Sequence, residues 1–336
     1  MPSLRSFIDS LAPASLAETA IDLGNLASGA PVSIPVVIAR GATPGKCLWI
    51  NGQVHGDELN GVFSALDFVR SVPLGSLAGT IVVTATANPW ALDIRRKRAS
   101  QDDLDLDQSF PGHANGLTTE RTAAKLYAEV SACADALVSM HSMGTPFDCE
   151  PFAVYKIASS GGVDEMTQLR LLAQFGPGYA CYMPVHSRPG ELPGHLAGSI
   201  DYQLLESGKP AFMIELGAGG RYDPRHVKQG VEGMTGVAGV LGMLPGAQRK
   251  VKSVVRVKRY QHVTCARGGL FRAARRPDTA LAANEVYGEI IDLHGRVVES
   301  LSIDHPVRLI GIRRDPVVHS GERVSFVAHE WDEVAL

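Results

Sequence analysis

Short apolar runs recur along the first 245 residues of the chain. Each run is brief, rich in β-branched side chains and bounded by Gly, Pro or Asn, which is typical of strands buried in a sheet. The runs cover residues 32–39, 46–50, 80–88, 135–140, 152–157 and 211–216. We therefore expect a buried strand at each of these places.

Longer amphipathic segments lie between the runs. Residues 58–72 carry apolar side chains near the helical spacing of 3.6, so that one stripe faces a core. Residues 118–136 begin with a threonine pair suited to cap a helix, and residues 195–208 end on Gly208, a common helix terminator. The alternation of strands and helices predicts an α/β fold with a mostly parallel mixed sheet flanked by helices.

The pattern changes after residue 245. Residues 251–336 carry short strand-like runs separated by Gly, Asp-Pro and His-Pro turns, and no long helical period appears. This pattern is typical of an all-β domain. We place the boundary near residue 246, which predicts a larger α/β domain over residues 1–246 and a smaller C-terminal all-β domain over residues 247–336.

Composition and charge narrow the class of protein. The 336 residues are 45% hydrophobic and 20% charged, so the chain can bury a large core. The net charge of −3 argues against a nucleic-acid partner, and no apolar stretch approaches the length of a membrane span. The five cysteines are scattered, which suits a reducing compartment, and the N-terminus lacks the apolar core of a signal peptide. We expect a cytoplasmic protein.

Two polar side chains follow the predicted strand at residues 46–50. His55 and Glu58 would lie over the carboxyl end of the sheet, where open α/β folds bind their ligands. The spacing alone is weak evidence, because His319 and Glu322 repeat it in what we interpret as an ordinary turn.

A third candidate ligand and a candidate base lie at the same predicted edge. His141 follows the strand at residues 135–140, and two His with one Glu form an established zinc set that leaves one coordination position open. Such a centre needs a further carboxylate to activate water, and Glu215 lies near the end of the strand at residues 211–216. The alternatives are a structural, hydrogen-bonded histidine and a glutamate that caps a turn or forms an ion pair.

Five segments resemble one known family in their order along the chain. They are HGDELNG, NPWALDIRRKR, DLDQSFPG, SMHSMG and FMIELG, and they resemble the succinylglutamate desuccinylase/aspartoacylase family. The resemblance extends from about residue 30 to the end, and residues 268–295 are similar to the family's C-terminal domain. It implies a zinc carboxypeptidase-like (M14) fold with one zinc ion per subunit.

The resemblance also implies roles for single residues. His55, Glu58 and His141 would be the zinc ligands, and Glu215 would be the general base and proton shuttle. An arginine in the basic run 95–98 would polarise the scissile carbonyl, an effect of about 3 kcal/mol for a well-aimed donor. The register favours Arg98, with Arg95 and Arg96 as alternatives, and the competing interpretation of the run is a solvated basic turn.

The chain departs from the family at one motif. The usual DLNR-x-FPG reads DLDQSFPG, so Asp107 and Gln108 stand where the resemblance implies an Asn–Arg pair that grips a substrate carboxylate. Gln108 has no charge and Asp107 would repel an anion. Asp107 would instead receive a neutral or cationic substrate group, or pair with the neighbouring basic run. Arg188 and Arg221 are candidates to replace the missing arginine.

We therefore expect a zinc-dependent amidohydrolase that removes an N-acyl group from a small amine or amino acid. The small-molecule N-acyl substrate would be similar to N-acetyl diaminobutyrate rather than to succinylglutamate. Two alternatives stay open: a metallocarboxypeptidase acting on small peptides, and a catalytically inactive homologue that binds a metal or a small molecule. Exposed strand edges in the C-terminal domain would allow pairing into a homo-oligomer.

Overall fold

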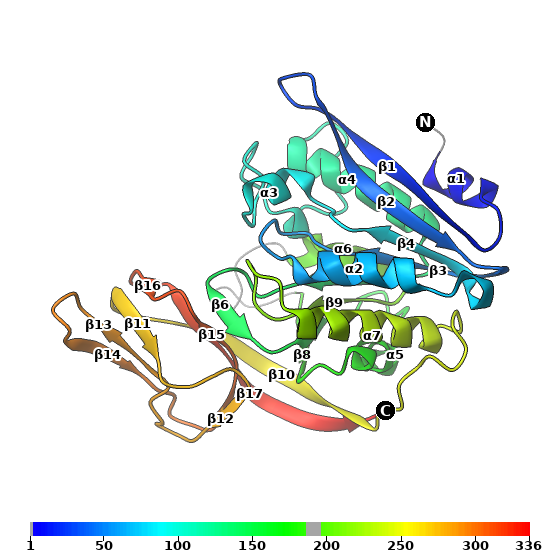
Figure 1. Cartoon of the computed structure of the whole chain (residues 1–336). Coiled ribbons are helices and arrows are strands. Elements are labelled where there is room, and N and C mark those ends of the chain that lie inside the picture. Colours follow the sequence, from blue (N-terminus) through cyan, green and yellow to red (C-terminus); the bar gives the residue numbers. More distant parts are fainter. Residues whose placement is uncertain (1–2, 186–195) are drawn as a thin grey trace.

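A mixed β-sheet forms the centre of the larger domain in the computed structural model, which describes residues 3–185 and 196–336 (Figure 1). Its strands are β1 Ser15–Asn25, β2 Pro31–Arg40, β3 Thr43–Asn51, β4 Ala78–Thr84, β5 Ala136–His141, β7 Phe152–Tyr155, β8 Ala180–Tyr182 and β9 Ala211–Glu215. They lie in the order β1-β2-β4-β3-β5-β9-β7-β8. Strands β4, β3, β5 and β9 are parallel neighbours, and so are β7 and β8. The β1–β2, β2–β4 and β7–β9 pairs are antiparallel.

The predicted fold class is confirmed. Each of the six predicted apolar runs contains a strand, and the sheet is mixed with a parallel centre. Strand β1 was not predicted. Its side chains alternate between exposed and partly buried positions, so it lacks the continuous apolar run that marks the other strands.

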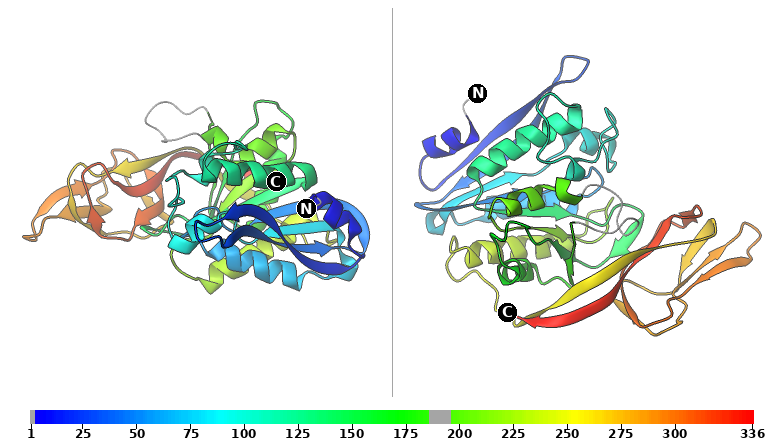
Figure 2. Two further views of the ribbon diagram at one scale, coloured as in Figure 1. Left: turned by 90° about the horizontal axis from the view of Figure 1, so that it is seen from above. Right: turned by 180° about the vertical axis from the view of Figure 1, so that it is seen from behind.

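Helices cover both faces of this sheet (Figure 2). They are α1 Leu4–Ser10, α2 Asn60–Ser71, α3 Pro89–Ile94, α4 Thr118–Cys133, α5 Glu165–Leu172, α6 Ile200–Glu206 and α7 Pro224–Val240, with short 3-10 turns at η1 Leu74–Ser76, η2 Leu106–Gln108, η3 Ala173–Phe175 and η4 Leu196–Gly198. Helices α2, α5 and α7 pack on the face that carries Leu48 and Ile50, and α1, α4 and α6 pack on the face that carries Trp49. Alternate residues of β3 therefore belong to two separate hydrophobic cores, one on each face of the sheet. In residues 3–185 and 196–336, no helix is long and apolar enough to cross a membrane.

The sheet continues into the C-terminal domain. The strands of this domain are β10 Ser253–Thr264, β11 Gly269–Ala273, β12 Thr279–Leu281, β13 Gly288–Ile291, β14 Val297–Leu301, β15 Val307–Arg313, β16 Val317–Val318 and β17 Arg323–Ala335. Strand β10 pairs in parallel with β8, and β17, β15 and β12 extend the same sheet. Strand β6 Phe147–Cys149 pairs in an antiparallel manner with the last residues of β15. A smaller sheet has the order β14-β13-β11-β16. The boundary at residue 246 stays a prediction.

An apolar seam joins the two domains. Phe152, Val154 and Cys181 pack against Val257 and Phe326 of the C-terminal domain. The long β10–β17 ribbon curves away from the helices and carries the smaller sheet at its far end (Figure 1). Arg256 on β10 reinforces the seam, because its guanidinium lies 2.9 Å from Glu165 of α5 and 2.7 Å from Asp332 of β17.

Candidate metal centre and active site

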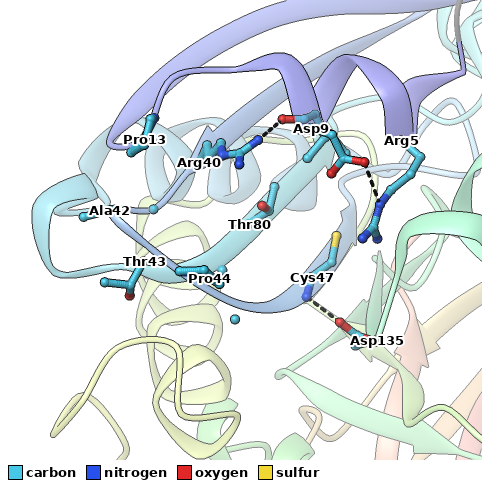
Figure 3. A pocket seen from close by; sticks show the side chains of 14 residues that line it. Arg5, Asp9, Pro13, Arg40, Ala42, Thr43, Pro44, Cys47, Thr80 and Asp135 are labelled. Atoms are coloured by element: carbon cyan, nitrogen blue, oxygen red, sulfur yellow. Dashed lines mark hydrogen bonds and ion pairs between the residues drawn. The ribbon is translucent and has the colours of Figure 1, made fainter.

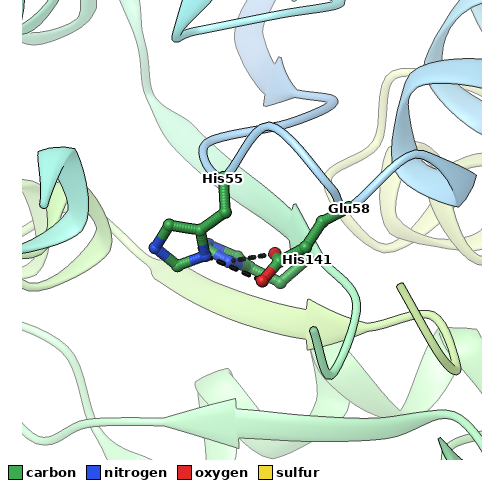
Figure 4. A group of neighbouring side chains, drawn as sticks. All are labelled: His55, Glu58 and His141. Atoms are coloured by element: carbon green, nitrogen blue, oxygen red, sulfur yellow. Dashed lines mark hydrogen bonds and ion pairs between the residues drawn. The ribbon is translucent and has the colours of Figure 1, made fainter. Parts of the chain in front are cut away.

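The three predicted metal ligands converge at the carboxyl edge of the parallel strands. His55 and Glu58 lie in the loop between β3 and α2, and His141 is the last residue of β5 (Figure 4). Nδ1 of His55 lies 2.8 Å from Oε1 of Glu58, and Nδ1 of His141 lies 3.0 Å from Oε2 of the same carboxylate. One potential ligand atom from each residue lies within 4.8 Å of the others, and all three side chains are buried.

Each imidazole ring makes a further hydrogen bond through its Nε2 atom, which fixes the orientation of the ring. Nε2 of His55 lies 3.1 Å from Oδ1 of Asp105, and Nε2 of His141 lies 3.2 Å from the hydroxyl of Ser139. A carboxylate or hydroxyl behind a ligating imidazole is the usual arrangement at protein metal sites, since it fixes the ring and leaves the other nitrogen for the metal. The donor set and its supports therefore fit a zinc ion.

Backbone packing holds the loop that carries His55. Gly56 donates its N–H to the carbonyl of Arg96 at 2.8 Å. A Cβ on Gly56 would lie 1.9 Å from the carbonyl oxygen of Ala91, so only glycine fits at this close approach. At the other end of the loop, the buried Asn60 donates to the carbonyl of Leu216 at 2.8 Å. The loop after β3 is thus tied to the segment that follows β9.

The close contact between Glu58 and the two imidazoles shifts the pKa values of the cluster. Burial opposes ionisation of Glu58, but His55 and His141 outweigh it and hold the pKa of this carboxyl well below its usual range. Burial also disfavours charge on His55, but Glu58 and the hydrogen bond to Asp105 raise the pKa of its ring to about 10. A metal ion competes with protons for these nitrogens, so metal binding at neutral pH would release protons.

Glu215 is the last residue of β9 and lies beside His141 in the sheet register. Burial, and then the negative charge of Glu58, raise the pKa of the Glu215 carboxyl to about 7. Among the described residues, its Oε2 atom has no hydrogen-bond partner. A carboxyl with these properties can accept and return a proton near neutral pH.

A cavity of about 190 Å³ contains these groups. His55, His141 and Glu215 line it, together with Asp107 and Gln108. This volume suits a small molecule better than an extended peptide.

One residue of the basic run 95–98 lines the described part of the cavity, and the three arginines of the run do not. Arg98 is half-exposed and lies 3.6 Å from the exposed Asp103. Arg95 and Arg96 are exposed, and the part of the cavity formed by described residues is lined by none of the three arginines. Lys97 is the member of the run that lines it, with Nζ 3.2 Å from Oδ2 of Asp105. The oxyanion role of Arg98 stays a prediction.

Asp107 and Gln108 both line the cavity. Burial raises the pKa of the Asp107 carboxyl, and its Oδ1 atom has no hydrogen-bond partner among the described residues. Gln108 Nε2 donates to Oδ2 of Asp105 at 3.2 Å. The proposed pairing of Asp107 with the basic run is absent from the ion pairs of the described residues.

Arg221 and Arg188 were the two candidates to replace the arginine that the family motif has and this chain lacks. Arg221 lies 2.7 Å from Asp148 and is absent from the lining formed by described residues. Arg188 lies outside the described residues. His319 and Glu322 form a turn, as expected, in which the His319 N–H donates to Glu322 at 2.8 Å.

Sequence reasoning missed several side chains that line the cavity. Lys156, at the end of β7, contacts both oxygens of Asp201, at 2.8 and 2.7 Å. His262 of β10 and Arg323 of β17 come from the C-terminal domain. The only signal for Lys156 was a lysine at the end of an apolar run, and nothing in the sequence pointed to His262 or Arg323.

A larger cavity of about 360 Å³ lies near the amino end of β3 (Figure 3). Its charged groups are engaged: Arg5 lies 3.4 Å from Asp9, and Arg40 donates to the carbonyl of Ile8. Burial raises the pKa of the Cys47 thiol in its wall to about 12, so this thiol is a poor nucleophile. The reactive groups are therefore gathered in the smaller cavity.

Comparison with known proteins gives matches along most of the chain. A family model described as the succinylglutamate desuccinylase/aspartoacylase catalytic domain matches residues 44–241. An N-alpha-acetyl-L-2,4-diaminobutyric acid deacetylase of Halomonas elongata is 28% identical over 198 residues, which are 57% of this chain and 54% of the relative. The chain thus spans about half the length of this curated relative.

Solved structures share the fold over nearly the whole chain. The product-bound ectoine utilization protein EutE (DoeB) of Ruegeria pomeroyi superposes with a TM-score of 0.81 and 20% identity, covering 96% of this chain and 98% of that one. A succinylglutamate desuccinylase/aspartoacylase of Rhodobacter sphaeroides gives a TM-score of 0.80 and 19% identity, with 96% and 98% covered.

Proposed function

The chain belongs to the succinylglutamate desuccinylase/aspartoacylase family, and from this premise we propose that it is a zinc-dependent N-acyl amino acid deacylase. The convergence of His55, Glu58 and His141 in one buried cluster, with Glu215 in the same cavity, carries the proposal. The two imidazoles and the Glu58 carboxylate would hold one zinc ion per subunit. All five cysteines are free and buried, which supports our proposal of a cytoplasmic enzyme.

The chemistry divides between the ion and the side chains. Zinc, when bound, supplies a Lewis acid that polarises the amide carbonyl and lowers the pKa of water. Glu215 accepts the proton of the attacking water and returns it to the leaving nitrogen. The water oxygen bonds to the acyl carbon, the C–N bond breaks, and the products are a carboxylic acid and an amine.

Positive charge beside the developing oxyanion would come from the basic run. Arg98 is the residue predicted for this role, and Lys97 is the member whose side chain lines the cavity. Comparing Arg98→Gln with Lys97→Met separates the two. The variant that removes the oxyanion donor should lower kcat by about 100- to 1,000-fold, and the other should lower it far less.

The substrate we propose is N-acetyl-L-2,4-diaminobutyrate or a close analogue. Asp107 presents a buried carboxylate oxygen without a partner among the described residues, so a substrate ammonium would supply the missing contact. The relative of Halomonas elongata is a deacetylase of the N-alpha-acetyl isomer, which is the isomer that we propose here and that keeps the side-chain ammonium free. The cavity volume of about 190 Å³ suits an acylated amino acid, and peptide-release assays would test the alternative of a metallocarboxypeptidase acting on small peptides.

A substrate panel tests this proposal. Zinc-loaded protein is assayed with N-acetyl-L-2,4-diaminobutyrate, N-acetylaspartate and N-succinylglutamate, and the first should give the highest kcat/KM. Preference for either dianionic compound would show that the proposal misassigns Asp107 and Gln108.

Two variants test the roles of the side chains. Glu215→Gln should lower kcat by about 100- to 10,000-fold while zinc stays bound, because it removes the proton carrier and no metal ligand. Asp107→Asn should raise KM for N-acetyl-L-2,4-diaminobutyrate by about 10- to 100-fold. With N-acetyl-L-2-aminobutyrate, which lacks the ammonium, wild type and Asp107→Asn should have similar KM values. An active Glu215→Gln enzyme contradicts the base assignment.

A further inference from the structure

Two side chains of the C-terminal domain enter the wall of the candidate active site. His262 on β10 and Arg323 on β17 line the same cavity as His55, His141 and Glu215. The two strands are antiparallel neighbours, with Thr264 opposite Arg323 and His262 opposite Phe326. The C-terminal domain is therefore part of the substrate cavity as well as a neighbour of the catalytic domain.

Arg323 is partly buried and lacks an anionic partner among the described residues. Other arginines of the same ribbon are paired: Arg256 contacts Glu165 and Asp332, and Arg259 lies 2.7 Å from Glu330. Glu322, the chain neighbour of Arg323, lies 3.4 Å from Arg313 instead. Burial lowers the pKa of Arg323, and no carboxylate of the described residues opposes this effect. A guanidinium in this state is costly unless an anion accompanies it.

His262, which lines the same cavity, is affected by the charge of Arg323. Burial, followed by the charges of Arg323 and Lys97, lowers the pKa of the His262 imidazole to about 3. This neutral ring stacks on Phe326, with centroids 4.7 Å apart and planes at 26°, so its orientation is fixed. Its Nδ1 atom has no hydrogen-bond partner among the described residues. This part of the cavity thus offers a fixed imidazole and a guanidinium for which residues 3–185 and 196–336 provide no anionic partner.

We propose that Arg323 is the residue that binds the α-carboxylate of the N-acyl amino acid substrate, with His262 as a neighbouring polar contact. The inference rests on the proposed deacylase function and assigns a specificity residue to that site. Gln108 cannot supply the positive charge, and Arg221 is engaged by Asp148. Arg323 is the arginine among the described residues that lines the cavity. A planar guanidinium matches a carboxylate with two parallel hydrogen bonds.

The assignment accounts for the unusual motif at residues 107–108. Asp107 and Arg323 line one cavity and are an acidic and a basic side chain, so they suit a substrate with both an ammonium and a carboxylate. The carboxylate-binding function would have moved from the catalytic domain, where Gln108 stands, to β17 of the C-terminal domain.

The test compares Arg323→Gln with a matched control, Arg259→Gln, which removes an exposed arginine of the same ribbon. Both variants and the wild type are assayed with N-acetyl-L-2,4-diaminobutyrate and with its carboxamide, which lacks the negative charge. Arg323→Gln should raise KM for the acid about 10- to 100-fold, change kcat little, and leave KM for the carboxamide unchanged. Arg323→Lys should recover part of the loss, and Arg259→Gln should match the wild type.

Calorimetry gives a readout that does not depend on turnover. L-2,4-diaminobutyrate and its carboxamide are titrated into zinc-loaded wild type, and the acid should bind at least about 10-fold more tightly. Equal affinities would overturn the proposal, also if Arg323→Gln failed to fold. If the wild type hydrolysed neither compound but bound the acid more tightly, and Arg323→Gln lost that preference, the proposed function would fail while the role of Arg323 in binding stood. An active wild type with the same KM for the acid in Arg323→Gln would overturn the role of Arg323 alone.

Discussion

Replacing Lys156 by methionine should destabilise the protein severely. Nζ of Lys156 lies 2.8 and 2.7 Å from the two oxygens of Asp201, and the two side chains are 2% and 1% exposed. Lys156 lies at the end of β7 and Asp201 lies in α6, so the pair ties the sheet to one of its covering helices. Asp201 also acts on Asp107, since its negative charge contributes to the raised pKa of that carboxyl.

The magnitude follows from the geometry of the pair. At 2.7 Å and an effective dielectric constant of about 20, two unit charges attract by about 6 kcal/mol. Removing the two ions from water costs several kcal/mol each, so the intact pair contributes little net stability. Lys156→Met removes the attraction but leaves the cost of the Asp201 charge. We expect a loss of about 3–5 kcal/mol and a fall in Tm of roughly 4–7 °C.

Thermal unfolding of four proteins tests this reasoning. They are the wild type, Lys156→Met, the double variant Lys156→Met/Asp201→Leu, and the control Lys228→Met, which removes an exposed pair with Glu232. The double variant should regain most of the lost stability, and the control should lie within about 1 kcal/mol of the wild type. The reasoning is refuted if Lys156→Met unfolds like the wild type, or if the double variant is no more stable than the single one.

Four other changes have expected outcomes. His55→Ala should lower zinc, measured by mass spectrometry, from near one ion per chain to near none; a full complement would remove His55 from the ligand set. Asp105→Ala should weaken zinc affinity about 10- to 100-fold in a chelator competition, because His55 loses its hydrogen-bond partner. Gly56→Ala should lower both Tm and zinc content, since its Cβ would lie 1.9 Å from a carbonyl oxygen; an unchanged Tm would contradict this packing. His262 has a folded pKa of about 3, below the usual value of about 6.5, so below pH 6.5 the unfolded state binds a proton that the folded state does not. The free energy of unfolding therefore falls as the pH falls from 6.5 toward 3. In the His262→Phe variant this fall should be smaller by about 2 kcal/mol at pH 5, as measured by denaturant titrations at several pH values.

The convergence of His55, His141 and Glu215 could be predicted because each of them follows or lies near the end of an apolar run, and parallel neighbours bring such ends to one edge of the sheet. Glu58 joins them because it lies three residues after His55 in the same loop. The signal for each residue is therefore local in the sequence, and the parallel pairing of the strands brings the residues together.

Other parts of the site and fold depend on contacts that leave no local signal. Arg323 begins an ordinary strand of another domain, and long-range contacts such as the β8–β10 pairing and the apolar seam bring that ribbon against the catalytic domain. Helix α7 was not predicted because glycines recur along it, and glycine is a poor helix former. These glycines serve close packing: a Cβ on Gly233 would lie 2.2 Å from the ring of Phe175. Tertiary contact overrides intrinsic propensity in this helix.

The parallel contact between β8 and β10 makes the two domains interdependent during folding and production. A chain shortened to residues 1–246 would lose β10 and leave the backbone groups of β8 without partners along one edge. Cys181 on that strand and Val154 beside it would also lose the apolar side chains that cover them. An open apolar edge of this kind recruits other chains, so we expect the shortened protein to collect in inclusion bodies.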